Sequence, residues 1–268
     1  MGDKGSVLVC GVDEMASAVA RTLLLSGYAV ALHEAGPPAL LRRRMAYGDA
    51  WFDGSATLGG VEARRVGNDG ELLAGLRSGM FIPLLTLPRL ADVARWPWDA
   101  LVDARGPGAD RAGLAMELVL VLGPGGCAGT DCDLVMEVGG ADPGAVLRAG
   151  PAQGGPRRHG RAQDLVAAPV DGVFHSMRRI GETVPAGDML GLVGTTLLAA
   201  PMEGRLRGLL RPGVAVRAGQ PVAEIMGGAQ VQVSGIDKTD AMIARAVEFA
   251  LGLERDGLDP LPTRWRSA

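Results

Sequence analysis

An internal repeat constrains the fold of this chain more than any other feature of its sequence. Residues 168–193 align without a gap on residues 200–225, at a constant offset of 32. The eight identical pairs are Ala168/Ala200, Pro169/Pro201, Gly172/Gly204, Arg179/Arg211, Gly181/Gly213, Val184/Val216, Ala186/Ala218 and Gly187/Gly219. Each copy has the pattern of short strands separated by glycine turns and is too small to bury a hydrophobic face alone, so the copies must interlock. The repeat therefore predicts one compact β domain.

The repeat unit, A-P-x-x-G followed by G-x-x-V-x-x-G, resembles the biotinyl/lipoyl carrier domain, a barrel-sandwich hybrid. Carrier domains of this kind are modified on a lysine in the hairpin between their two halves. Here that joining segment is residues 192–197, and no lysine occurs between Lys4 and Lys238. Covalent attachment of biotin or lipoate is excluded, because an amide bond to either group requires a primary amine, which arginine does not offer. A structural or docking module is expected, or else a site built from other groups.

Strand and helix signals alternate in the first 150 residues. Short apolar runs predict buried parallel strands, and apolar residues at helical spacing predict helices between them. The expected strands are Val7–Cys10, Tyr28–Leu32, Phe81–Leu87, Ala100–Val102, Leu118–Leu122 and Leu134–Val138. The expected helices are Asp13–Leu25, Gly70–Leu76 and Leu90–Arg95, with a hairpin over Asp53–Val66. This alternation is typical of an α/β fold, here a Rossmann-like, mostly parallel sheet.

These signals predict the division into domains. Residues 1–150 form the Rossmann-like α/β domain, and residues 151–164, rich in glycine, proline and arginine, form a linker. Residues 165–228 form the small all-β, biotinyl/lipoyl-like barrel-sandwich hybrid. Residues 229–268 hold a C-terminal helix over Asp237–Leu251, which has one apolar face, and an irregular tail.

Composition argues against several classes of function. A net charge of −3 gives no basic field for a nucleic-acid partner. No apolar run reaches the roughly 18–20 residues of a membrane span and no signal peptide is visible, so a cytoplasmic protein without a membrane partner is expected. The three cysteines fit neither a disulfide framework nor a zinc knuckle, and the scattered histidines suggest no metal site. No catalytic residue is assigned, because no Ser-His-Asp order or nucleophile elbow is recognisable.

Two glycine-rich turns are candidate ligand sites. Residues 11–18 lie where a dinucleotide fold binds a pyrophosphate, but Gly11 is the only glycine left there. Asp13 and Glu14 place carboxylates where an anion would lie, so weak or no binding of NAD(H) is expected. Residues 122–132 follow a predicted strand, and their glycines could turn backbone N–H groups towards an anion. A tight turn without a ligand is the alternative for this second segment.

The candidate residues for cofactor binding come from the second turn and from an arginine run. They are Arg42, Arg43, Gly123, Gly125, Gly129, Asp131 and Cys132. Guanidinium groups bind phosphate oxygens bidentately, whereas the alternative for residues 42–44 is a solvated basic face. Cys127 and Cys132 could support sulfur or redox chemistry, although no neighbouring cation that would lower a thiol pKa is evident.

The order of motifs along the chain resembles that of the accessory proteins of the selenium-dependent molybdenum hydroxylase system. The matching positions are Gly11, Ala16 and Ser17; Arg42, Arg43, Tyr47, Ala50 and Gly54; Val102, Asp103, Ala104 and Arg105; and Gly123, Pro124, Gly125, Ala128, Gly129, Asp131 and Cys132. The chain departs from the family pattern at Asp13, Glu14, Ala18, Gly106, Gly126 and Asp133, which indicates a divergent member.

The resemblance implies an accessory or scaffold protein related to molybdoenzyme maturation factors, without catalytic activity of its own. Such a protein would dock a larger enzyme subunit or molybdoenzyme client, or would hold an anionic cofactor. The cofactor is not identified, and a molybdopterin-type ligand is one candidate. Homo-oligomer formation stays open. The alternative function is that of an NAD(P)-dependent oxidoreductase with a degenerate dinucleotide turn.

Overall fold

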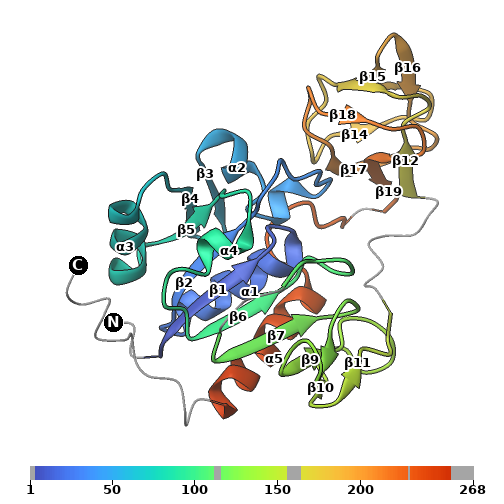
Figure 1. The fold of residues 1–268 in the computed structure, drawn as a ribbon. Helices are drawn as coiled ribbons and strands as arrows, with labels where there is room; N and C mark the ends of the chain where they lie inside the picture. The colour runs from blue at the N-terminus through green and yellow to red at the C-terminus, as the bar shows by residue number, and fades with distance from the viewer. Residues whose placement is uncertain (1–3, 112–115, 156–163, 229, 255–268) are drawn as a thin grey trace. The chain divides into compact units, whose positions relative to one another are not determined.

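The computed structural model describes residues 4–111, 116–155, 164–228 and 230–254, and it shows a mixed α/β fold with one large, mostly parallel sheet and smaller antiparallel sheets (Figure 1). The chain divides into two compact units. The first, called here the α/β unit, comprises residues 1–38, 46–157 and 236–268. The second, the β unit, comprises residues 39–45 and 158–235. Most of the predicted linker (residues 156–163) and the predicted tail (255–268) lie outside the described residues.

Nine described strands form the large sheet of the α/β unit, in the order β10-β9-β7-β6-β1-β2-β5-β4-β3. The strands are β1 (Ser6–Cys10), β2 (Ala29–His33), β3 (Ser55–Leu58), β4 (Val61–Arg65), β5 (Phe81–Leu85), β6 (Ala100–Asp103), β7 (Leu118–Leu122), β9 (Leu134–Met136) and β10 (Val146–Leu147). The edge strands β3 and β10 are antiparallel to their neighbours, and the other pairs are parallel. Every predicted strand of this region is confirmed, with boundaries that shift by at most two residues.

Helices cover this sheet on both faces, so its central strands are buried throughout (Figure 1). The helices are α1 (Glu14–Leu25), α2 (Asp49–Asp53), α3 (Asp69–Ser78), α4 (Leu90–Val93) and α5 (Lys238–Leu253). Side chains of α3 and α4 pack in one hydrophobic cluster with Leu8 and Cys10 of β1, while α1 packs against α5. The predicted helices and the hairpin, now β3 and β4, are confirmed. No helix of the described residues is both long enough and apolar enough to cross a membrane.

The β unit contains two sheets of four described strands each, ordered β12-β19-β17-β14 and β16-β15-β13-β18. The strands are β12 (Leu165–Ala167), β13 (Gly172–His175), β14 (Thr183–Val184), β15 (Met189–Val193), β16 (Thr196–Ala199), β17 (Gly204–Leu209), β18 (Ala215–Val216) and β19 (Pro221–Met226). A shift by the repeat offset carries the first four strands onto the last four. The same shift exchanges the two sheets, because each sheet takes two strands from each repeat. The predicted interlocking of the repeats is confirmed.

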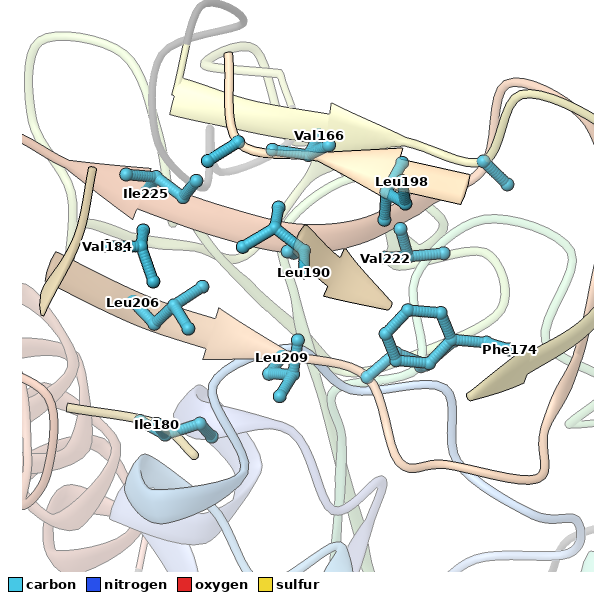
Figure 2. Packing of buried hydrophobic residues seen from close by; sticks show 14 of the residues in the cluster. Val166, Phe174, Ile180, Val184, Leu190, Leu198, Leu206, Leu209, Val222 and Ile225 are labelled. Atoms are coloured by element: carbon cyan, nitrogen blue, oxygen red, sulfur yellow. The ribbon is translucent and has the colours of Figure 1, made fainter. Parts of the chain in front are cut away.

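Apolar side chains from both repeats fill the interior of the β unit. Phe174, Leu190, Leu206 and Leu209 are almost fully buried and lie in one cluster (Figure 2). Each contributes about 1.5–3 kcal/mol by leaving water. Because the strands of each repeat pair with those of the other, neither repeat buries this cluster alone.

Two of the repeated glycine pairs have a geometric reason. Gly181 and Gly213 have φ of +100° and +88°, a backbone conformation that residues other than glycine rarely adopt. At Gly204 a Cβ would lie 2.7 Å from the Met226 carbonyl oxygen, and at Gly172 it would lie 2.9 Å from a backbone nitrogen. The glycine pattern that revealed the repeat therefore records turns and close strand contacts.

Residues 39–45 belong to the β unit although they connect β2 with α2 in the sequence. The Leu209 amide donates to the Leu41 carbonyl oxygen at 2.8 Å. Close approach is possible because residue 208 is glycine: a Cβ there would lie 2.9 Å from the Leu41 Cβ. No sequence pattern predicts this placement. The sequence assigns residues 39–45 to a continuous domain over residues 1–150, whereas the structure groups them with the β unit.

Candidate functional site

The carboxyl ends of three central strands carry a row of buried polar side chains. Cys10 of β1 is paired in register with His33 of β2 and with Asp103 of β6. The three residues are buried to 1% exposure or less. In open α/β sheets, ligands bind outside the carboxyl ends of the strands. This row of side chains is therefore a candidate ligand site.

Asp103 accepts four hydrogen bonds, all from two arginine residues. The Nε and the amide nitrogen of Arg105 donate to Oδ1 at 2.9 and 3.1 Å, and its Nη2 donates to Oδ2 at 2.9 Å. The Nη1 of Arg111 donates to Oδ2 at 2.9 Å. Burial alone would raise the pKa of Asp103, but the hydrogen bonds and charge of Arg105, and then Arg111, hold that pKa below its usual value. Asp103 is therefore ionised at neutral pH and orients both guanidinium groups.

The two arginine residues differ in what they reach. The Nη2 of Arg111 donates to the Gly125 carbonyl oxygen and lies 3.6 Å from the Asp131 carboxylate. Its buried Nε has no partner among the described residues. The Arg105 side chain is 24% exposed, against 8% for Arg111. Arg105 is therefore the cation of this pair that a ligand can approach from solvent.

Three further groups at this edge have shifted pKa values. Burial raises the pKa of Glu34, which directly follows β2, although backbone hydrogen bonds and Arg105 oppose the shift. Burial lowers the pKa of His33, whose Nε2 lies 2.8 Å from the Leu87 carbonyl oxygen. Burial, and then the charge of Asp103, raises the pKa of the Cys10 thiol. Such groups gather at functional sites as well as in structural ion-pair networks.

The first glycine-rich turn is closed by its own side chain. Gly11 has φ of +109°, which fits a ligand turn. The Asp13 carboxylate, however, caps α1 by accepting a hydrogen bond from the Ala16 amide at 2.8 Å. It lies where a bound anion would meet the helix N-terminus. Weak binding of NAD(H) stays a prediction, and this geometry supports it.

The second glycine-rich turn lies at the carboxyl end of β7, where the sequence predicts it. Its glycines are required by packing: a Cβ at Gly123 would lie 2.5 Å from the Val138 side chain, and one at Gly125 would lie 2.8 Å from the Gly106 backbone. At Gly126 it would lie 2.8 Å from Val121. The glycine string is therefore explained without a ligand.

Hydrogen bonds inside this turn engage several of its amides. Gly129 donates to the Cys132 carbonyl oxygen at 2.8 Å, and the Cys127 amide donates to the Asp131 carboxylate at 2.6 Å. Burial, and then Asp131, raises the pKa of the Cys132 thiol to about 12. A protonated thiol is a poor nucleophile, so the environment does not favour sulfur chemistry at Cys132. Ligand binding by Gly123, Gly125, Gly129, Asp131 and Cys132 stays a prediction.

The two arginines expected beside that turn belong to the other unit. Arg42 is 5% exposed, and its Nε and Nη2 each donate to the Glu224 carboxylate at 2.6 Å. The Nε of Arg43 donates to the Leu209 carbonyl oxygen at 3.0 Å. A solvated basic face is wrong for Arg42, which instead joins residues 39–45 to β19. The role of the two arginines in cofactor binding stays a prediction.

Sequence reasoning did not select the residues that the sheet edge brings together. In the sequence Arg105 is only the last residue of a Val-Asp-Ala-Arg motif, and the one local signal is a charged pair at the end of a buried strand. Arg111 lies in an irregular stretch that carries no local signal. Within the described ranges, no three His, Cys, Asp or Glu side chains are grouped so that they could hold a metal ion.

Comparisons with known proteins give one curated relative and several solved structures. No family model matches the chain. An uncharacterized protein of Escherichia coli, YqeB, is 30% identical over 231 residues, which cover 82% of this chain and 42% of that protein. The chain thus spans about two fifths of the length of this relative. Nothing in that protein's name describes an activity.

The solved structures that match belong to a different group of proteins. A succinylglutamate desuccinylase/aspartoacylase from Rhodobacter sphaeroides is 26% identical over 31% of each chain, with a TM-score of 0.24. An aspartoacylase family protein from Mesorhizobium loti is 13% identical over 82% of this chain and 84% of its own, with a TM-score of 0.28. With TM-scores this low, the likeness carries no argument about the activity of this chain.

These matches contradict the family expected from the sequence. They are desuccinylase and aspartoacylase proteins, not accessory proteins of the selenium-dependent molybdenum hydroxylase system. The functions derived from that resemblance, a molybdoenzyme maturation or scaffold protein and the alternative of an NAD(P)-dependent oxidoreductase, are corrected with it. The description of the β unit as a biotinyl/lipoyl-like domain is corrected for the same reason.

Proposed function

We propose that the α/β unit is a Rossmann-like domain that binds a small carboxylate at the edge of its sheet, and that the β unit is a separate barrel. The strand order supports the first part. The parallel strands follow the order β5-β2-β1-β6-β7-β9, which is the 3-2-1-4-5-6 order of doubly wound sheets. In that order the chain turns to opposite sides of β1, and the crevice between β1 and β6 is the usual ligand position.

The proposal is carried by one observation, the placement of Arg105 at this crevice. Its guanidinium is held in two contacts by Asp103, so little conformational freedom is lost when it binds a ligand. Within the described residues its Nη1 makes no hydrogen bond, and the side chain is partly exposed. An arginine fixed in this way can donate to a carboxylate of a bound molecule.

Neighbouring groups narrow the ligand class. Asp13 occupies the helix N-terminus that a pyrophosphate would need, which disfavours dinucleotides. Glu34 is the other acid near this edge, and burial raises its pKa. A small mono- or dicarboxylate is the ligand class that remains.

A nuclear magnetic resonance titration tests this function. Acetate, succinate and glutarate are added separately to the ¹⁵N-labelled full chain, and at least one is expected to shift the backbone amide signals of Gly11, Ala104 and Gly106. Replacement of Arg105 by alanine should weaken that binding about tenfold or more, because a charge-assisted hydrogen bond is lost. Arg64→Ala is the matched control, since the exposed Arg64 of β4 pairs with Glu62 and lies over the Phe81 ring, away from Asp103.

Three results would count against the proposal. None of the three carboxylates shifts the sheet-edge signals, or Arg105→Ala binds as tightly as the unaltered chain, or the control weakens binding as much as Arg105→Ala does. The variant Arg105→Lys keeps the charge but loses the forked geometry, and it is expected to bind at an intermediate level. It also keeps the test informative if the alanine variant does not fold.

A further inference from the structure

The β unit contains a cavity that lies entirely within its own residues. Its volume is about 550 Å³, within the range of small-molecule sites. The residues that line it are Gly181, Thr183, Glu203, Gly204, Arg205, Gly227 and Gly228. Four of these are glycines, so backbone and a few polar side chains make up most of the wall.

Arg205 is the cation of this wall. It is paired in register with Thr183 of β14 and with Met226 of β19, so the three side chains share one face of the sheet. Its Nε donates to the Gly181 carbonyl oxygen at 2.9 Å. Among the described residues the rest of its guanidinium has no hydrogen bond or ion pair.

Arg44, which the chain crossing of residues 39–45 brings into the β unit, approaches the same glycine. Its Nη1 donates to the Ile180 carbonyl oxygen at 3.2 Å. A Cβ placed on Gly181 would lie 3.6 Å from this Nη1 and 3.8 Å from the Nη2 of Arg205. Two guanidinium groups therefore flank one point, each fixed by a backbone carbonyl.

The acids nearby do not neutralise these two cations. Glu203 lies on the cavity wall but forms no ion pair with any described residue. Glu224 is already bound by Arg42. Arg44 and Arg205 carry +2 and Glu203 carries −1, so these three side chains together have a net charge of +1. Like charges held close together repel, and an anion between them would remove that repulsion.

We infer that this cavity binds a small molecule through a phosphate or carboxylate group, which lies between Arg44 and Arg205 beside Gly181. Guanidinium groups pair with either anion in forked geometry. Glycine at 181 leaves room for the group to approach the backbone. This site lies in the other unit from the one proposed above and does not depend on it.

Calorimetric titration of the full chain with inorganic phosphate, and separately with citrate, tests the inference. Binding of at least one is expected, and the tighter of the two identifies the preferred anion. Arg205→Ala and Arg44→Ala should each weaken it about tenfold or more. Glu203→Gln should strengthen it, because the only acidic side chain of the wall is neutralised. Arg217→Ala removes an exposed positive charge elsewhere in the β unit and should leave binding unchanged.

Other outcomes overturn the inference. Neither anion binds at millimolar concentration, or both arginine variants bind like the unaltered chain, or Arg217→Ala weakens binding equally, which would show a nonspecific charge effect. A weaker complex with Glu203→Gln would also contradict it. Because Arg44 and Arg205 lie on different segments, a folding failure in one variant still leaves the other as a test. Arg105→Ala should bind phosphate and citrate here normally, which separates failure of this site from failure of the sheet-edge site.

Discussion

Both units contain a buried carboxylate bound by arginine, but the two ion pairs join different parts of the chain. Glu224 in the β unit is bound by Arg42, which is 182 residues away in the sequence. Asp103 in the α/β unit is bound by Arg105, two residues away. The Arg42–Glu224 pair attaches residues 39–45 to β19. The Asp103–Arg105 pair joins no distant parts of the chain, and its arginine stays partly exposed. The same chemistry holds a fold together in one unit and orients a candidate site in the other.

The second cation near each carboxylate sharpens this comparison. Arg111 donates to Asp103 at 2.9 Å, so Asp103 keeps a direct partner when Arg105 is removed. Arg207 approaches Glu224 only to 3.6 Å. Loss of one arginine should therefore cost the β unit more than the α/β unit.

Arg42→Ala is expected to have the largest effect on stability. It leaves the Glu224 charge buried without its bidentate partner, which costs about 3–5 kcal/mol of unfolding free energy. Hydrogen exchange measured by mass spectrometry should show faster exchange in β17 and β19. Replacing both partners by apolar residues, Arg42→Met with Glu224→Leu, should recover most of the loss. If β17 and β19 of Arg42→Ala exchange at the rate of the unaltered chain, Arg42 does not stabilise the β unit.

Arg105→Ala should have an intermediate effect, about 1–2 kcal/mol, because Arg111 still holds Asp103. Urea unfolding followed by tryptophan fluorescence suits this measurement, since Trp51, Trp96 and Trp98 all lie in the α/β unit. A loss as large as that of Arg42→Ala would show that the Asp103 group is also part of the framework. The contrast between the two units would then disappear.

Replacement of His33 should have the smallest effect on the free energy of unfolding, and only at acidic pH. Burial lowers its pKa in the folded chain, so the unfolded chain takes up a proton first as pH falls below about 6.5. The stability associated with neutral His33 is thus present above pH 6.5 and is lost as pH falls towards the folded pKa. His33→Gln should flatten the stability profile between pH 7 and 5, whereas His175→Gln, on an exposed strand position, should not. Equal profiles for the unaltered chain and His33→Gln would exclude this assignment.

The regular elements were predictable because their signals are local. Apolar runs such as Val7–Cys10 predict strands whatever their neighbours are. The repeated glycines predict turns, because the positive φ of Gly181 and Gly213 is a property of each residue. The apolar face of residues 237–251 predicts α5, which begins one residue later because the Asp237 side chain caps it by accepting from the Thr239 amide.

The site residues were less predictable because their partners are remote or irregular. An arginine run is compatible with a phosphate site, a solvated face or a buried ion pair, and only the approach of Glu224 decides for Arg42. Gly125 lies in a segment with the pattern of an anion-binding loop. Glycine is required there, however, because a Cβ would be too close to the Gly106 backbone. The expected family rested on the order of motifs along the chain, and that order does not report contacts of this kind.

Residues 39–45 also determine when the fold of the β unit can be completed during synthesis. Arg42 leaves the ribosome before Glu224 exists, and at about 5–20 residues per second the intervening 182 residues take roughly 10–40 s. The α/β unit must wait as well, because α5 is translated after the β unit and packs on α1. A chain released by a stalled ribosome before Glu224 is added therefore contains neither unit in finished form, and one released between Gly235 and the end of α5 still lacks a finished α/β unit. Such fragments should be strong clients for chaperones and proteases, whereas the complete protein should not.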